Sequence, residues 1–214
     1  MGEKFPLEKG LTGVWVGYIL ALFLFFIMMS PITSRFVNLW YTMACCGLML
    51  TLIGHKSNPN LLSISFNLKS LLWGVLIAAG LWGIFWIGNW ASAHLFSFST
   101  IQVGRIYNFK IGSNQWIIGL LLFFIIGPAE EIFWRGFVQK KLSIHWGKNI
   151  GFIVATLMYT SVHFASCNFM LIMAAFVAGF YWGLIYKIFP HSLPALIISH
   201  SLWDVCTFLI FPIH

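Results

Sequence analysis

Two adjacent glutamates, Glu130 and Glu131, lie inside a stretch that is otherwise typical of a membrane helix. Arg135 follows Glu131 by four residues, so these two side chains share one helical face, whereas Glu130 points about 100° away from Glu131. A charged residue at the bilayer centre costs about 2.5–3.5 kcal/mol on insertion scales, so such residues face the protein interior and usually serve function. The two glutamates can therefore have different tasks at one buried site.

Two further apolar segments carry polar residues with the same spacing of four. Tyr159 and His163 form one pair, and His200 and Asp204 form the other. At a rise of about 1.5 Å per residue, the titratable members of both pairs lie at nearly the depth of Glu130, close to the middle of a hydrocarbon layer about 30 Å thick. Antiparallel helices can therefore bring these side chains into one pocket.

These residue types can activate water. A carboxylate in a desolvated pocket can act as a general base, a neighbouring histidine can share the proton, and a second histidine can donate to an oxyanion. No GxSxG or HExxH motif is present in the sequence. Zinc held by Glu130, His163 and His200, one from each of three helices, is an alternative that the spacing leaves open. A structural alternative is a helix-stapling pair of Glu131 and Arg135, with each histidine a satisfied buried polar residue.

The composition indicates that the helices positioning these residues cross a membrane. The chain is 60% hydrophobic and only 8% charged, whereas soluble domains carry about 25% charged residues. We expect an all-α, polytopic membrane helical bundle of about seven transmembrane helices (six to eight), at about 20 residues per span. Residues 1–214 then form a single integral membrane domain, with the catalytic core helices in 115–211. Basic loops at a membrane surface explain the net charge of +7 without a nucleic-acid partner.

Seven apolar segments are the expected spans. They cover residues 11–29, 36–53, 68–87, 115–138, 149–165, 168–186 and 192–211. The stretch 100–110 is predicted to lie along the membrane surface, 140–148 is predicted to be a basic loop, and Asn168 is a further polar residue out of place in lipid. Eight lysines fall on the N-terminal side of such a bundle and three basic residues on the other. The positive-inside rule therefore predicts a cytoplasmic N-terminus, in the cell (inner) membrane.

In order and spacing, the polar motifs resemble the CPBP family of intramembrane proteases. That family includes the type II CAAX prenyl endopeptidases and the bacterial Abi or bacteriocin-processing group, and its pattern is EExxxR, then FxxxH, then HxxxN or HxxxD. The corresponding residues here are Glu130, Glu131, Arg135, Tyr159, His163, His200 and Asp204. The resemblance covers about residues 117–208, and the first three segments match only as generic membrane spans.

The resemblance implies that Glu130 and His163 activate the hydrolytic water and that His200 and Asp204 form the oxyanion-side or positioning pair. Family members are generally viewed as glutamic-type proteases without metal, so no cofactor is expected, and zinc is the less favoured alternative. Asp204 stands where the prenyl endopeptidases have Asn. Because ionised Asp cannot donate to an oxyanion, Asp204 is expected to orient His200 as its acceptor or to stay protonated.

The same resemblance makes Glu131, Arg135 and Tyr159 supporting residues, and Tyr159 replaces the usual Phe of the pattern. The predicted function is an intramembrane endopeptidase that hydrolyses a peptide bond of a membrane-associated protein or peptide, including one lipidated at its C-terminus. Its partners are that substrate and the lipid bilayer. Three alternatives stay open: a zinc-dependent peptidase with the same residues, a non-catalytic immunity or scaffold membrane protein, and a proton-coupled transporter.

Overall fold

A computed structural model of the protein describes residues 10–213, and this range contains helices and connecting turns but no β-strand. The α-helices are α1 (Thr12–Met29), α2 (Leu39–Ser57), α3 (Leu68–Leu95), α4 (Ser99–Asn108), α5 (Gln115–Leu121), α6 (Gly127–Glu131), α7 (Lys140–Trp146), α8 (Lys148–Ser161), α9 (Phe169–Ile188) and α10 (Leu193–Val205). Tighter or wider helical turns are η2 (Ser34–Phe36), η3 (Pro59–Leu62), η4 (Leu122–Ile126), η5 (Ile132–Gln139), η6 (Val162–Ser166) and η7 (Cys206–Ile210). The prediction of an all-α bundle is confirmed.

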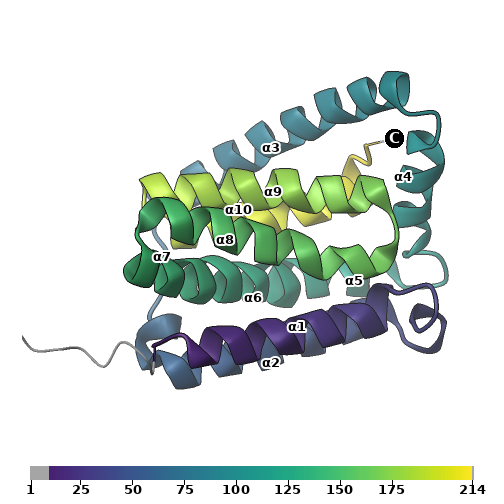
Figure 1. Ribbon diagram of the computed structural model, residues 1–214. Coiled ribbons are helices and arrows are strands. Elements are labelled where there is room, and N and C mark those ends of the chain that lie inside the picture. The colour runs from purple at the N-terminus through teal and green to yellow at the C-terminus, as the bar shows by residue number, and fades with distance from the viewer. Residues whose placement is uncertain (1–9, 214) are drawn as a thin grey trace, which may run out of the picture.

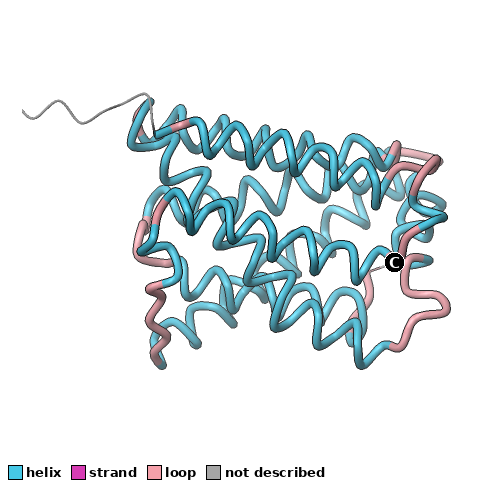
Figure 2. The backbone as a smooth tube through the Cα atoms, turned by 90° about the horizontal axis from the view of Figure 1, so that it is seen from below, coloured by secondary structure: helices cyan, strands magenta, loops and turns pink. Residues whose placement is uncertain are grey.

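The long helices run side by side, with α1 and α2 along one edge of the bundle and α3 along the opposite edge (Figure 1). The connecting loops lie mainly at the two ends of the bundle (Figure 2). Helix α4 crosses one of these ends, at a steep angle to the long helices (Figure 1). All of this helix except Ser99 falls within the segment 100–110 that was predicted to lie along the membrane surface, and that location stays a prediction.

Five helices of the described chain are long and apolar enough to cross a membrane: Thr12–Met29, Leu68–Leu95, Gln115–Trp146, Phe169–Ile188 and Leu193–Ile210. The helical membrane bundle is therefore confirmed, and the count of seven spans stays a prediction. The other two expected spans correspond to α2 and α8. Helix α2 ends in polar residues, and α8 has 14 residues, fewer than the roughly 20 that a perpendicular span needs.

The basic stretch 140–148 is not the predicted loop. Segments α5, η4, α6, η5 and α7 form one continuous helix, Gln115–Trp146, which we call the central helix. Lysine is a good helix former, so Lys140 and Lys141 extend the helix instead of ending it. The helix stops at Gly147, whose φ of +84° is a conformation that glycine adopts readily and other residues do not.

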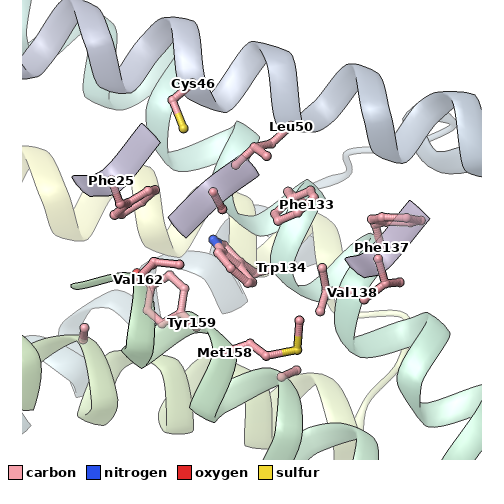
Figure 3. Packing of buried hydrophobic residues seen from close by; sticks show 14 of the residues in the cluster. Phe25, Cys46, Leu50, Phe133, Trp134, Phe137, Val138, Met158, Tyr159 and Val162 are labelled. Atoms are coloured by element: carbon pink, nitrogen blue, oxygen red, sulfur yellow. The ribbon is translucent and has the colours of Figure 1, made fainter. Parts of the chain in front are cut away.

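The largest apolar core surrounds the η5 part of the central helix. Trp134 of this segment lies between Phe25 of α1 and the α8 side chains Met158 and Tyr159, while Phe133 faces α2 (Figure 3). The rings of Trp134 and Tyr159 meet edge to face at 5.4 Å. Because dense packing on several sides leaves few alternative rotamers, the polar residues of the same helix are held in fixed positions.

Candidate active site

The two glutamates occupy α6, a single helical turn between two π-helical segments, η4 and η5. Pro128 lies in this turn and lacks a backbone N–H, so the regular hydrogen-bond ladder is interrupted directly before the glutamates. Single-turn π segments in α-helices are frequent at functional sites. Glu130 is 8% exposed and Glu131 is fully buried, as expected for charged residues turned away from lipid.

A close approach of two helices places α10 beside the glutamates. A Cβ atom on Gly127 would lie 2.9 Å from the backbone nitrogen of Ser201, so only glycine allows this distance between α6 and α10. His200, the residue before Ser201, then reaches Glu131, and its Nδ1 lies 2.8 Å from Glu131 Oε1. The sequence therefore positions the second histidine through the small residue at the helix contact.

Glu131 is the centre of a buried ionic network. Its Oε1 accepts from Arg135 Nη1 at 2.7 Å and from His200 Nδ1. Arg135 is 2% exposed and also donates to the backbone oxygen of Gly179 on α9, at 3.3 Å. The carboxylate of Glu131 therefore joins Arg135 of its own helix to His200 of α10, and Arg135 extends the network to α9.

The imidazole of His200 is constrained on its other sides as well. Its Nε2 lies 3.6 Å from Asp204 Oδ2, longer than a hydrogen bond but within ion-pair range. Trp182 of α9 stacks on the imidazole, with ring centroids 4.0 Å apart and an angle of 21° between the planes. Glu131, rather than the expected Asp204, is thus the close acceptor of His200, and Asp204 lies at longer range from the other ring nitrogen.

Glu130 and His163 are linked through Tyr159. The hydroxyl of Tyr159 donates to Glu130 Oε2 at 3.0 Å, and the backbone oxygen of Tyr159 accepts from His163 Nδ1 at 2.9 Å. His163 lies in η6, directly after α8, and Phe25 of α1 contacts its ring edge to face at 5.1 Å. Since Nδ1 donates to a carbonyl, Nε2 of His163 is the nitrogen that can interact with a ligand.

All four predicted catalytic residues line one cavity of about 430 Å³. The residues concerned are Glu130, His163, His200 and Asp204, and Tyr159 lines it too. The rest of the wall is mainly apolar, with side chains from α3, α4, α9 and η7 such as Phe85, Val103, Met170 and Phe208. The other two supporting residues, Glu131 and Arg135, lie behind this wall. The structure brings the predicted set together, and the chemical role of each member stays a prediction.

Asn168, which also stood out in the sequence, has a structural task. It caps the N-terminus of α9, where its Oδ1 accepts from the backbone of Leu171 at 3.1 Å. Its Nδ2 donates to the backbone oxygen of Gln102 on α4, at 2.9 Å. This residue therefore connects α4 to α9, and it is not among the described residues that line the cavity.

Sequence reasoning missed Trp182 and Gly179. Helix α9 carries small residues at every fourth position, Ala175, Gly179 and Gly183, a pattern that indicates close helix contacts in membranes. A Cβ atom on Gly179 would lie 2.7 Å from the ring of Tyr159, which shows how tightly α9 packs there. The pattern could have predicted that α9 lies against the site, but not which aromatic ring stacks on His200.

The side chains as arranged do not fit the zinc alternative. Within residues 10–213, no group of three or more His, Cys, Asp or Glu side chains is placed to hold a metal ion. Zinc coordination by Glu130, His163 and His200 would require these side chains to move together, because zinc ligands lie about 2.0–2.2 Å from the ion. Independence from metal stays a prediction for direct measurement.

Residues 112–206 match a family model described as "Type II CAAX prenyl endopeptidase Rce1-like". The matched segment contains every predicted site residue, and the resemblance inferred from the three motifs is confirmed over this segment. No curated protein and no solved structure matches the chain. The family match supports an intramembrane protease of the CAAX type, an integral membrane protein that acts on a peptide or protein.

Proposed function

Because the site region is similar to type II CAAX prenyl endopeptidases, we propose that this protein hydrolyses a peptide bond of a membrane-associated protein or peptide, using water activated by Glu130 and His163. The observation that carries the proposal is that Glu130, His163 and His200 line one shared cavity, whose wall is mainly apolar. Polar groups that face such a cavity contribute no apolar packing, and their cost in a membrane is high, so they indicate function.

Glu130 is the proposed general base. Tyr159 occupies Oε2 of its carboxylate, so Oε1 can accept a proton from a water molecule in the cavity. Nε2 of His163 can hold the same water, because Nδ1 is already bound to a backbone carbonyl. The water oxygen then bonds to the scissile carbonyl carbon, and the carbonyl oxygen becomes an oxyanion. General-base catalysis of this kind contributes typically about 10²–10⁴-fold to the rate.

His200 is the proposed donor to the oxyanion. Glu131 accepts from its Nδ1, and Asp204 Oδ2 lies 3.6 Å from its Nε2. In this proposal the ring carries a proton on both nitrogens, so Nε2–H can donate to a substrate oxygen that lies in the plane of the ring, and removal of one such donor costs about 10²–10³-fold in kcat in other hydrolases. When the tetrahedral intermediate breaks, the C–N bond opens and Glu130 returns its proton to the leaving amine.

The proposed substrate presents an apolar part beside its scissile bond. The cavity wall is mainly apolar and its volume of about 430 Å³ lies within the range of sites for single small ligands. A lipidated C-terminus or an extended apolar segment would place its chain against Phe85, Val103 and Phe208, with the peptide bond at Glu130. Substrates without such a part would lose most of the binding energy.

We also propose that the N-terminus faces the cytoplasm, in the cell (inner) membrane. The end of α2, the starts of α3 and α8, the segment α7 and the end of α9 lie at one end of the bundle (Figure 1). The lysines carried there are Lys56, Lys69, Lys140, Lys141, Lys148 and Lys187. Lys4 and Lys9 belong to the same predicted side but lie outside the described residues. Basic residues concentrate on the cytoplasmic side.

The test compares membrane peptides and new protein termini in cells that carry wild type or Glu130→Gln at matched expression. We expect specific cleavage products to vanish, because the amide cannot accept the proton. Identical products from both cells, with a phenotype on deletion of the whole protein, would favour the scaffold or transporter alternatives. Metal analysis of the purified protein tests the zinc alternative, and cleavage that is lost on chelation and restored by zinc would contradict the metal-free mechanism.

A further inference from the structure

We infer that Tyr159 is a positioning residue that orients both members of the water-activating pair. Its hydroxyl donates to Glu130 Oε2 at 3.0 Å, and its backbone oxygen accepts from His163 Nδ1 at 2.9 Å. One residue thus sets which carboxylate oxygen and which imidazole nitrogen remain for water. The inference rests on the proposed function and adds a specific device to it.

The direction of the hydroxyl is fixed because the ring of Tyr159 is held on several sides. The guanidinium carbon of Arg135 lies 4.8 Å from the ring centroid, and the ring of Trp134 meets it edge to face. On α9, Gly179 leaves no room even for a Cβ atom beside the ring. A side chain that is 5% exposed and enclosed in this way cannot swing away from Glu130 without repacking.

The hydroxyl solves an orientation problem at Glu130. A carboxylate has two equivalent oxygens and rotates about its last bond, so a base without a partner would present either oxygen in a range of directions. A donor on Oε2 leaves Oε1 as the acceptor. Small displacements of reacting groups cost up to about 10²-fold in rate, and loss of this orientation is therefore expected to lower the rate rather than the amount of protein.

Tyr159→Phe is the central test, because it removes one oxygen atom and keeps the ring contacts. The matched control is Tyr181→Phe, whose hydroxyl donates to the backbone oxygen of Ile77 at 3.1 Å and which is not among the described lining residues. In the cellular assay, Glu130-dependent termini should form about ten-fold more slowly with Tyr159→Phe. They should form at the wild-type rate with Tyr181→Phe, at equal amounts of folded protein.

An infrared measurement on purified protein makes the test independent of substrate. The difference spectrum of wild type minus Glu130→Gln identifies the absorption of the Glu130 carboxyl group. We expect this band to shift in Tyr159→Phe and to stay unchanged in Tyr181→Phe. An unshifted band, or a loss of activity that is equal in both tyrosine variants and matches their loss of folded protein, would overturn the inference.

The same design decides three further outcomes. If Tyr159→Phe does not fold, the test uses 3-fluorotyrosine at position 159, which keeps the hydroxyl and makes it a stronger donor. A Glu130 band at the wild-type frequency in that variant then overturns the inference. If wild type and Glu130→Gln yield the same termini, the proposed hydrolysis fails and the role of Tyr159 in it fails as well. Wild-type cleavage rates in Tyr159→Phe, with Glu130→Gln inactive, overturn only the role of Tyr159.

Discussion

The most apolar 18-residue stretches of the central helix and of α3 have the same mean hydropathy, 1.9. In the central helix 44% of the residues in that stretch are buried inside the protein, and in α3 only 22% are. Helix α3 contacts mainly α10 through one stripe, which includes Gly74, Ile77, Ala78 and Leu81. The central helix is enclosed by its neighbours along η5, where seven of eight residues are buried. Two helices of equal hydropathy therefore occupy different positions: α3 lies at the edge of the bundle and the central helix lies at its centre.

The difference arises from the residues that break the apolar pattern. The central helix carries Glu130, Glu131 and Arg135, which need partners inside the protein, whereas the described α3 has Lys69 near its start as its one Lys, Arg, Asp or Glu residue. Lipid is as apolar as leucine, so burial of apolar groups does not by itself drive helices together in a membrane. Polar contacts and close packing thus determine which of two similar helices becomes the centre.

The largest effect is expected where the comparison rests on charge. Glu131→Ala leaves Arg135 and His200 buried without their shared acceptor. Removal of one partner from a buried ion pair costs about 3–5 kcal/mol, so we expect a large loss of folded protein as well as of activity. The measurement is thermal unfolding in detergent, together with the amount of protein recovered from the membrane.

Lys140→Ala on the same helix is the control for this prediction. Lys140 is exposed, and its removal should change stability by no more than about 0.5 kcal/mol. Equal stability of Glu131→Ala and Lys140→Ala, with full activity in both, would show that the buried network does not support the site. The contrast between the two helices would then have to rest on packing alone.

The sequence predicts most of the fold and the membership of the site, because both depend on patterns along the chain. Apolar length predicts the spans, and spacing of four predicts the shared face of Glu131 and Arg135. Contacts between helices depend on rotation and distance, which periodicity does not contain. For this reason the sequence offered Asp204 as one acceptor for His200 but did not predict Glu131, which the approach at Gly127 brings to the Nδ1 of His200 while Asp204 lies 3.6 Å from Nε2. The hydrogen bond of Tyr159 to Glu130 also depends on how two helices are rotated and spaced, so the sequence did not predict it either.

The second prediction concerns packing of the backbone. Gly127→Ala places a methyl group against the backbone of Ser201, which cannot move as a flexible side chain can. Overpacking costs typically about 1–3 kcal/mol, and the backbone contact favours the upper end. Gly83→Ala on α3 is the matched control, because no atom lies within 4 Å of the added Cβ. Thermal unfolding should therefore separate the two variants, and similar midpoints would contradict the close approach.

The third prediction examines the narrow contact of α3. Leu81 is fully buried against α9 and α10, whereas Leu76 is 62% exposed on the same helix. Leu81→Ala should cost about 2 kcal/mol, at the low end of the usual range for such changes, since the membrane supplies little hydrophobic driving force. Leu76→Ala should be near neutral in the same unfolding experiment. A larger effect at Leu76 would place that face of α3 against protein instead of lipid.

The smallest effect is expected at Asn168, a polar residue at a helix start rather than inside the central helix. Asn168→Ala removes the cap of α9 and the contact with Gln102, and loss of a helix cap costs about 0.5–2 kcal/mol. Asn168→Ser keeps an oxygen for the cap but lacks the amide donor, so it should recover most of that loss. Both variants should form the Glu130-dependent termini at wild-type rates once folded protein is matched. A rate that falls while the unfolding midpoint stays constant would instead assign Asn168 to the site, because a cap acts on stability alone.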